Sequence, residues 1–340
     1  MKVVLAGGTG ALGSRLAADL HGRGHEVVVL TRRLRPAPYR QVEWDGRTVG
    51  PWASELAGSA VVNLAGALVD RRPTPANIEL LTRSRVEPTR ALVAAVRALP
   101  RPVPVLVQMS TLAIYGDAGE QVLDETAPPA DGPPQMAGVA RAWEAAVDGA
   151  AADRVVVLRT AVVFDNDSPA LDRLLGLARW GLGGRIAGGR QWISWLHIDD
   201  WLAIVREVLE PTAAPLTGIV HVTSPNPVRN AELMAALRTV THRPPAPPTP
   251  APLARLGALL LRTDPALALT GRRAVPARLL AQGFRFAHPD LTGALADLTA
   301  PDRRDHRPPR RPRVDLRRRA LRRPSASTPS PTRHGNSRGR

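Results

Sequence analysis

The sequence predicts an α/β fold with a doubly wound parallel sheet, a smaller C-terminal α/β lobe and a disordered basic tail. Three observations lead to this prediction. Short β-branched runs alternate with amphipathic stretches over the first half of the chain, and a glycine-rich turn follows the first of these runs. Residues 301–340 are rich in proline, serine and arginine and contain no aromatic residue. Such alternation is typical of βαβ units with right-handed crossovers, and such a tail composition is typical of disorder.

Six apolar runs are expected to form strands, and three amphipathic stretches between them are expected to form helices. The strand candidates are residues 3–6, 26–30, 61–64, 103–109, 154–158 and 218–223, and the helix candidates are 12–21, 85–98 and 135–150. A connector with six prolines at residues 243–252 precedes an apolar helix near 253–261. The predicted domains are 1–240, with smaller-lobe segments interleaved from about residue 165, then 241–300 and the tail 301–340.

Composition excludes several classes of protein. The chain of 340 residues contains no cysteine, so it has no disulfide framework, thiolate metal site or cysteine nucleophile. The N-terminal apolar run is short and is broken by Gly7 and Gly8, unlike a signal peptide, and no stretch is apolar for long enough to span a bilayer. We therefore expect a cytoplasmic protein without membrane insertion.

Most of the positive charge lies in the tail. Residues 301–340 contain 14 Arg and 3 Asp, which gives +11 of the total +16 and leaves +5 for residues 1–300. Lys2 is the only lysine, so the arginine excess favours a coding bias over selection for a polyanion. Clusters such as Arg317–Arg319 suit phosphates of nucleic acid or of an anionic membrane, but the tail has no aromatic residue for base stacking. We expect weak nonspecific adhesion and no specific nucleic-acid partner.

The glycine-rich turn is the strongest functional signal. The first apolar run leads directly into Gly7-x-x-Gly10-x-x-Gly13, and a helix is expected to begin behind it. The first glycine permits a tight turn, the second lets the backbone approach a pyrophosphate, and the third lets the helix pack closely. The N-terminus of the helix offers free N–H groups to the phosphates. The motif predicts a Rossmann-like dinucleotide site, to which Thr9 and Leu12 also contribute.

The end of the second predicted strand indicates which dinucleotide binds. An NAD enzyme usually places an acid there for the ribose 2′-hydroxyl, but this chain has Thr31, Arg32 and Arg33. Guanidinium groups bind a 2′-phosphate that a carboxylate would repel. The sequence therefore favours NADP(H), with Arg32 and Arg33 as its 2′-phosphate ligands.

Beyond this turn, the chain resembles the atypical extended short-chain dehydrogenases/reductases, and more narrowly the NAD-dependent epimerase/dehydratase family proteins with a C-terminal DUF1731 domain. The resemblance covers about residues 1–298, and the order of the motifs makes it specific. The motifs are GGTGALGSRL at 7–16, NLAGA at 63–67, SRVEPTRAL at 84–92, STLAIYG at 110–116, ARAWEAA at 140–146, QWISWLHIDD at 191–200, SPNPVRNAEL at 224–233 and AVPARLLAQGFRFAHPDLTGALADL at 274–298.

The resemblance implies further site residues. The segment of Asn63, Ala65 and Gly66 would close over the adenosine side of the cofactor, with a satisfied turn residue as the alternative for Asn63. Ser110 and Thr111 would lie beside the nicotinamide, and Thr111 matches the catalytic Ser/Thr of the family.

The chain lacks the acid–base pair of short-chain dehydrogenases. The usual Tyr-x-x-x-Lys pair uses the lysine cation to lower the tyrosine pKa. Here Met136 aligns with the tyrosine and Ala140 with the lysine, and Lys2 opens the first strand, away from the cofactor. Tyr115 is the remaining phenol near the site, and without a neighbouring cation its pKa is expected to stay near 10. A pocket-wall role for Tyr115 is at least as well supported as catalysis.

Two functional hypotheses follow. In the first, the protein is an NADP(H)-dependent oxidoreductase or epimerase-like enzyme that acts on a small carbonyl or hydroxyl compound, a class that includes sugars. Thr111 and Tyr115 would then be its catalytic residues. In the second, it is a non-catalytic NADP(H)-binding regulator. Gln191 and Trp192 lie where extended family members meet their substrate, so they are the candidate substrate residues. A homodimer is compatible with either hypothesis.

Two other chemistries are disfavoured. His197, Asp199 and Asp200 form a His-x-Asp-Asp cluster, but the sequence supplies no third metal-ligand partner at matching spacing, so no metal is expected. One of the two aspartates is instead expected to cap the following helix. No Gly-x-Ser-x-Gly elbow is present, which argues against a serine hydrolase.

Overall fold

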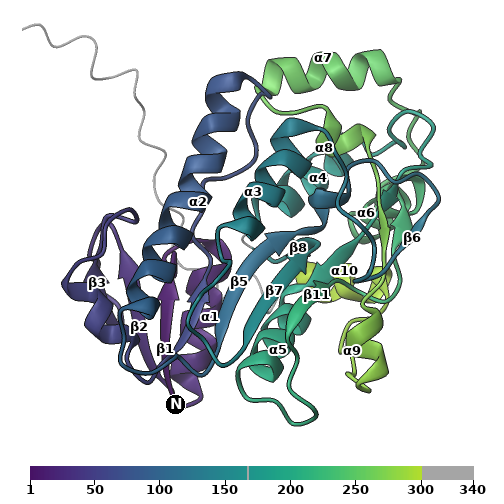
Figure 1. Cartoon of the computed structure of the whole chain (residues 1–340). Coiled ribbons are helices and arrows are strands. Elements are labelled where there is room, and N and C mark those ends of the chain that lie inside the picture. The colour runs from purple at the N-terminus through teal and green to yellow at the C-terminus, as the bar shows by residue number, and fades with distance from the viewer. Residues whose placement is uncertain (167, 301–340) are drawn as a thin grey trace, which may run out of the picture. The chain divides into compact units, whose positions relative to one another are not determined.

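A seven-stranded parallel sheet forms the centre of the computed structural model, which describes residues 1–166 and 168–300 (Figure 1). The strand order is β11-β7-β5-β4-β1-β2-β3, so the chain starts at β1, builds one half of the sheet and then returns to build the other. This order is that of a doubly wound fold and confirms the predicted fold class. The strands are β1 Lys2–Ala6, β2 Glu26–Thr31, β3 Arg40–Glu43, β4 Ala60–Asn63, β5 Leu106–Thr111, β7 Val155–Thr160 and β11 Gly218–Val222.

Strands β3 and β5 of the central sheet differ from expectation. Strand β3, an edge strand whose only apolar residue is Val42, was not predicted, because a strand paired on one side needs no continuous apolar run. Strand β5 begins at Leu106 instead of residue 103, since Pro104 has no N–H for the ladder. Val103 retains only an isolated bridge to Ala152.

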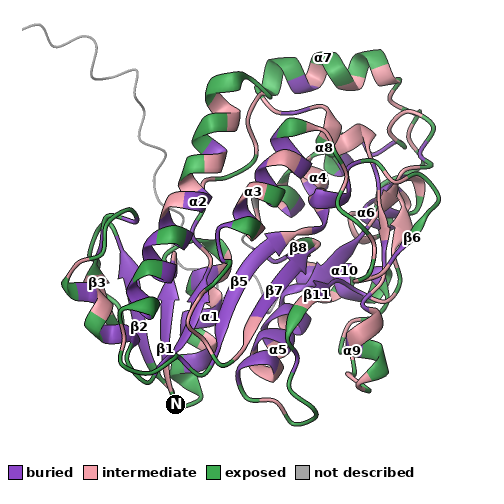
Figure 2. Cartoon of the chain, in the orientation of Figure 1, coloured by how far each residue is buried: buried purple, intermediate pink, exposed green. Residues whose placement is uncertain are grey.

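Helices cover both faces of the sheet, and the side chains of each strand alternate between two cores. Helix α1 (Ala11–Gly22) and helix α5 (Ile198–Leu209) share one core with Val3 and Leu5, whereas helix α2 (Pro75–Arg97) packs on Val4 and Ala6 on the other face. Figure 2 shows the central strands as buried along most of their length. Within the described residues, no helix is long and apolar enough to cross a membrane.

The helices around the site also differ from the predicted ranges. Helix α2 begins ten residues before position 85, because Thr74 caps it with its side-chain oxygen and Pro75 occupies its first position. The predicted helix 135–150 is a π-helical turn, η3 (Pro134–Gly138), followed by the short helix α3 (Val139–Ala145).

The remaining elements lie outside the seven-stranded sheet. Three two-stranded pairs join distant segments: β8 (Val162–Phe164) with β10 (Trp195–His197), β9 (Trp192–Ile193) with β12 (Val228–Arg229), and β6 (Val122–Leu123) with β13 (Arg273–Ala274). The other helices are α4 Pro169–Arg179, α6 Asn230–Val240, α7 Ala251–Leu261, α8 Ala266–Leu269, α9 Ala277–Ala281 and α10 Leu291–Thr299, with the 3₁₀ turns η1 Pro51–Leu56 and η2 Leu112–Tyr115. The predicted tail lies outside the described residues.

Candidate cofactor and active site

The glycine turn after β1 has the close contacts that its motif predicts. Gly7 has φ +78°, and a Cβ there would lie 2.8 Å from the backbone nitrogen of Ala65. A Cβ on Gly13 would lie 2.6 Å from the carbonyl oxygen of Gly7, so helix α1 can approach the turn only with glycine at that position. Gly10 precedes the first residue of α1, and no side chain caps that helix end. No side chain of the described residues takes up the first-turn N–H groups, which is the arrangement of a helix end that can bind phosphate.

The parallel sheet brings the other predicted cofactor residues to the same edge. Because the strands run in parallel, the carboxyl ends of β1, β2, β4 and β5 lie side by side, with the chain reversal between β1 and β4. Arg32 and Arg33 follow β2, and both are exposed. Among the residues that the structure describes, neither forms an ion pair. Thr9 is exposed in the turn, and Leu12 is half-buried on the first turn of α1.

The buried side chain of Asn63 holds the loop after β4 in place through hydrogen bonds. Its Nδ2 donates to Thr89 Oγ1 at 2.8 Å and to Gln108 Oε1 at 2.9 Å, while its Oδ1 accepts the N–H of Ala65 at 3.1 Å. The side chain is fully buried. These bonds support the alternative that Asn63 is a turn residue whose polar atoms are satisfied within the protein. Contacts of this loop with a cofactor would then come from exposed neighbours such as Gly66.

A chain of polar contacts runs from the end of β5 across the sheet. Ser110 Oγ donates to Glu144 of α3 at 2.5 Å, and Glu144 accepts two bonds from Arg159 of β7, at 2.9 and 2.8 Å. Arg159 also donates to the Tyr115 hydroxyl at 2.7 Å, and that hydroxyl lies 2.5 Å from Nε2 of His221 on β11. All five side chains are buried or nearly so.

The bonding determines where each proton lies. Nδ1 of His221 faces the carbonyl oxygen of Val275 at 3.0 Å, so Nδ1 carries the hydrogen and Nε2 accepts from Tyr115. Burial lowers the pKa of His221 to about 4, which keeps the imidazole neutral. The Tyr115 hydroxyl therefore accepts from Arg159 and donates to His221.

This network corrects the prediction that Tyr115 has no cation beside it. The guanidinium of Arg159 lies against the phenol, yet burial raises the Tyr115 pKa above 10 and outweighs the opposing effect of Arg159. The hydroxyl hydrogen of Tyr115 is thus already donated to another group of the protein.

Thr111 has the more available hydroxyl. Its oxygen accepts the N–H of Ala113 and so caps the turn η2, but its hydroxyl hydrogen has no acceptor among the described residues. The side chain is half-buried at the carboxyl end of β5. Met136 and Ala140, which the sequence aligns with the usual tyrosine and lysine, are both buried and apolar.

The predicted substrate residues lie on and beside strand β9. Gln191 donates to the carbonyl oxygens of Ile186 and Ala268, and the Trp192 indole donates to Glu120 at 3.0 Å. The guanidinium groups of Arg229 and Arg273 lie 4.1 and 4.5 Å from the centre of the Trp192 ring. A pocket of about 250 Å³ opens here, and its lining includes Asp117, Glu120, Arg190, Gln191, Trp192 and Gly271.

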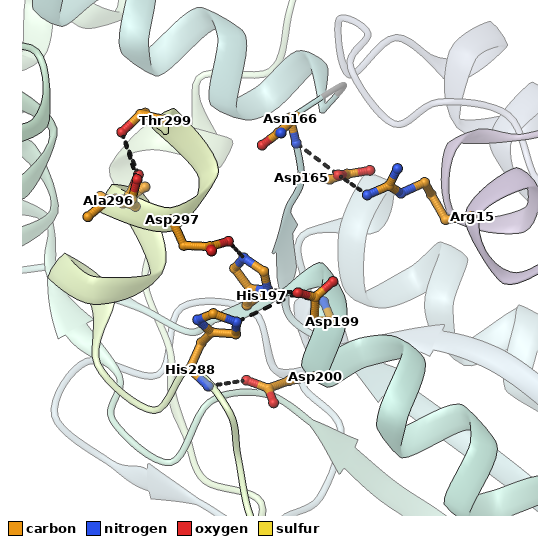
Figure 3. A network of polar contacts seen from close by, with 11 residues as sticks. Arg15, Asp165, Asn166, His197, Asp199, Asp200, His288, Ala296, Asp297 and Thr299 are labelled. Atoms are coloured by element: carbon orange, nitrogen blue, oxygen red, sulfur yellow. Dashed lines mark hydrogen bonds and ion pairs between the residues drawn. The ribbon is translucent and has the colours of Figure 1, made fainter. Parts of the chain in front are cut away.

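The His-x-Asp-Asp turn does not have the predicted cap. His197 itself caps helix α5, because its Nδ1 accepts the N–H of Asp199 at 3.1 Å. Its Nε2 lies 3.2 Å from Asp297 of α10, and its ring stacks on that of His288 (Figure 3). Asp200 accepts the N–H groups of Ala287 and His288 at 2.7 and 2.9 Å. Oδ2 of Asp199 lies 3.7 Å from Nε2 of His288, so both aspartates contact the C-terminal segment instead of capping α5.

The structure also supplies partners that the sequence spacing did not reveal. His197, Asp199, His288 and Asp297 each place one ligand-type atom within 4.8 Å of the others. However, both nitrogens of His197 already contact protein groups, since Nδ1 accepts a backbone N–H and Nε2 faces Asp297. This bonding fits a structural junction between α5, α10 and the segment between α9 and α10.

Three residues of the polar network, Glu144, Arg159 and His221, were not predicted from the sequence. One signal was available, because an arginine within the buried run VVVLRT must have a partner. Glu144 also lies within the ARAWEAA motif, one helical turn after Ala140.

Comparison with known proteins agrees with the fold and the glycine turn. Residues 3–221 match the NAD dependent epimerase/dehydratase family, and residues 249–298 match a domain of unknown function, DUF1731. The chain therefore belongs to the NAD dependent epimerase/dehydratase family, as the resemblance implied. Its NAD(P)-binding Rossmann-like fold is confirmed.

Individual relatives extend over most of the chain. Epimerase family protein SDR39U1 of Bos taurus is 33% identical over 305 residues, which cover 88% of this chain and 100% of that protein. The chloroplastic SDR39U1 homolog of Arabidopsis thaliana is 32% identical over 305 residues, 87% of this chain and 86% of that protein. The crystal structure of human SDR39U1 (isoform 2) with NADPH has a TM-score of 0.77 and 30% identity, with 88% of this chain and 99% of that chain covered.

Proposed function

We propose that the protein is an NADP(H)-dependent oxidoreductase or epimerase-like enzyme that acts on a small carbonyl or hydroxyl substrate. The observation that carries this proposal is the steric fit of the glycine turn, followed on the next strand by two exposed arginines that form no ion pair within the described residues. The likeness to human SDR39U1, whose structure contains NADPH, supports the same cofactor. A bound NADP(H) would supply or accept the hydride. Arg32 and Arg33 would hold its 2′-phosphate, and the first-turn N–H groups of α1 its pyrophosphate.

In this proposal Thr111 is the group that meets the substrate oxygen. Its hydroxyl stands at the end of β5 and keeps its hydrogen available for a carbonyl or alkoxide. Tyr115 fixes the turn that carries Thr111, because its hydroxyl is held by Arg159 and His221. Substrate recognition falls to Gln191 and Trp192, as the sequence indicates.

A second candidate function is a non-catalytic NADP(H)-binding regulator. Two observations favour it: Met136 and Ala140, which align with the usual tyrosine and lysine, are buried and apolar, and Tyr115 already donates its hydrogen to His221. A regulator would bind NADPH without consuming it.

A fluorescence titration of the full chain with NADPH and NADH tests the cofactor proposal. We expect tighter binding of NADPH, and we expect Arg32→Ala and Arg33→Ala to weaken it by roughly 10- to 100-fold each, the effect of losing a charged hydrogen bond. Arg255→Ala, on exposed helix α7, is the matched control and should bind as the wild type does. Equal affinity for NADPH and NADH would contradict the choice of NADP(H).

Once turnover is found, Thr111→Ala separates the two functions further. The enzyme hypothesis predicts a large loss of turnover with NADPH affinity retained. Unchanged turnover would remove Thr111 from the mechanism, and NADPH that is bound but never oxidised by any carbonyl compound would favour the regulator.

A further inference from the structure

Arg272 is held rigidly beside the predicted substrate strand. Its N–H donates to the carbonyl oxygen of Trp192 at 3.0 Å, and its own carbonyl oxygen accepts from Ser194 Oγ at 3.0 Å. The preceding residue, Gly271, passes so close to β9 that a Cβ there would lie 2.7 Å from the Trp192 carbonyl oxygen. The backbone thus fixes the point from which the Arg272 side chain extends.

The guanidinium of Arg272 points toward the position where related enzymes carry their tyrosine. Nε donates to the carbonyl oxygen of Gly116 at 2.9 Å, Nη2 donates to Thr270 Oγ1 at 3.1 Å, and Nη2 lies 4.0 Å from the sulfur of Met136. Met136 replaces that tyrosine, so the cation lies next to the expected reaction centre.

No carboxylate balances this charge directly. Among the described residues, no acidic side chain forms an ion pair with Arg272, and burial lowers the pKa of its guanidinium, with Asp117 opposing that effect from farther away. Asp117 is engaged elsewhere, since its Oδ1 accepts the N–H of Gly271 at 3.0 Å. A guanidinium that is partly removed from water and has no counterion is costly, and a bound anion would offset that cost.

A second polar group near Met136 also has an unmatched atom. Gln135 is buried, and its Nε2 donates to the carbonyl oxygen of Arg71 at 2.8 Å and to Asp264 at 3.3 Å. Those two acceptors fix the orientation of the amide. The Oε1 of Gln135 has no hydrogen-bond partner among the described residues. It could therefore accept a hydrogen bond from a ligand hydroxyl.

Arg85, a buried arginine that forms no ion pair among the described residues, shows what an internally compensated guanidinium looks like. It donates to the carbonyl oxygens of Leu81 and Ala67 and lies 5.0 Å from the ring centre of Trp143. Arg85 is 8% exposed, whereas Arg272 is only half-buried and has no aromatic ring beneath it in the described structure. The charge of Arg272 is therefore less fully compensated within the protein than that of Arg85.

We propose that Arg272 binds an anionic group of the substrate, a carboxylate or a phosphate, beside the site that Thr111 and Met136 define. The inference rests on the proposed function, since it names the substrate class of that site. It predicts a substrate that carries both an anion and a hydroxyl or carbonyl group, with Gln135 as the acceptor for a hydroxyl.

The test uses the full chain saturated with NADPH, so that added anions do not occupy the cofactor's phosphate positions. Inorganic phosphate and acetate are titrated separately against chloride at equal ionic strength, and the unfolding midpoint is measured. We expect one of the two anions to raise the midpoint by about 2 °C at ten times its Kd. Arg272→Gln should abolish the rise, and Arg255→Gln should retain it.

The outcomes distinguish this inference from the proposed function. A rise with phosphate alone identifies a phosphate-bearing substrate, and a rise with acetate alone a carboxylic acid. No rise in the wild type, or an equal rise in Arg272→Gln, overturns the inference even where NADPH binds normally. If NADPH does not bind, the proposed function fails, and the same anion comparison is made without cofactor. Arg272→Lys, which keeps the charge but not the planar fork, should show a reduced rise and is the variant to use if Arg272→Gln does not fold.

Discussion

Tyr115 donates its hydroxyl hydrogen to Nε2 of His221 across 2.5 Å, although 106 residues separate the two in the chain. This contact joins the turn after β5 to strand β11. On its other side, His221 donates from Nδ1 to the carbonyl oxygen of Val275 in the DUF1731 segment. The direction of the contact depends on a neutral imidazole, because a protonated His221 would have no lone pair with which to accept from Tyr115.

The first prediction concerns the pH dependence of stability. The pKa of His221 is about 4 in the folded protein, against 6.5 for an unperturbed histidine, so the unfolded chain binds the extra proton as the pH falls below 6.5. Stability is therefore lost on going from neutral pH toward pH 4, and His221 should account for about 2 kcal/mol between pH 7.5 and 5. Denaturant unfolding of wild type and His221→Gln at both values measures this share.

Glutamine keeps an acceptor for Tyr115 but does not titrate, so the variant should lose less stability than the wild type over this interval. His242→Asn is the control, because His242 is exposed and its left-handed backbone suits asparagine. An identical loss of stability in wild type and His221→Gln would show that His221 is not the titrating group.

The second prediction concerns the buried ion pair of Glu144 and Arg159. Removal of one partner leaves the other charge buried, which typically costs about 3–5 kcal/mol. We expect Arg159→Met and Glu144→Gln each to be strongly destabilising, and the double variant to be less destabilised than the sum by about 2 kcal/mol. A double-mutant cycle of urea unfolding measures this coupling, and strictly additive effects would refute it.

Local sterics explain what could be predicted from the sequence. The glycine turn and the strands of the central sheet follow from residues that are neighbours in the chain, so their spacing alone indicates the geometry. Gly7 and Gly13 are required by contacts within the same βα unit and with the adjacent strand. The edge strand β3 was not predicted because it pairs with a neighbour on one side only and so does not need a continuous run of apolar residues.

The polar network could not be predicted because its partners come from different strands. Tyr115 and Arg159 are 44 residues apart, and the direction of each hydrogen bond depends on the tautomer of His221, which only the tertiary contacts determine. The cap of α5 was assigned to the wrong residue for a similar reason. Aspartate is the commoner capping residue, but Asp200 is used by the backbone of residues 287 and 288.

The third prediction tests that use of Asp200. Asp200→Ala would leave the N–H groups of Ala287 and His288 without their acceptor in a partly buried place, at a cost of about 1–3 kcal/mol for each. Hydrogen exchange should show faster exchange of these two amides and reduced protection of helix α10. Asp148→Ala, at an exposed position, should leave the exchange unchanged. Unaltered protection in Asp200→Ala would mean that other contacts dock the C-terminal segment.

The last prediction separates the steric role of glycine from its effect on chain flexibility. At Gly13 a methyl group would meet the Gly7 carbonyl oxygen at 2.6 Å and the Cα of Gly8 at 2.7 Å, so Gly13→Ala must push helix α1 away from the turn. At Gly22, the other end of α1, a methyl group would have nothing within 4 Å, and the φ of this residue is not positive. Gly22→Ala should therefore stabilise the protein by up to about 1 kcal/mol, because alanine loses less backbone entropy. Gly13→Ala should destabilise it and weaken NADPH binding, since the N–H groups of the first turn move with the helix. Denaturant unfolding and NADPH titration of both variants measure the contrast, and a Gly13→Ala protein with wild-type stability and affinity would show that the turn tolerates a side chain there.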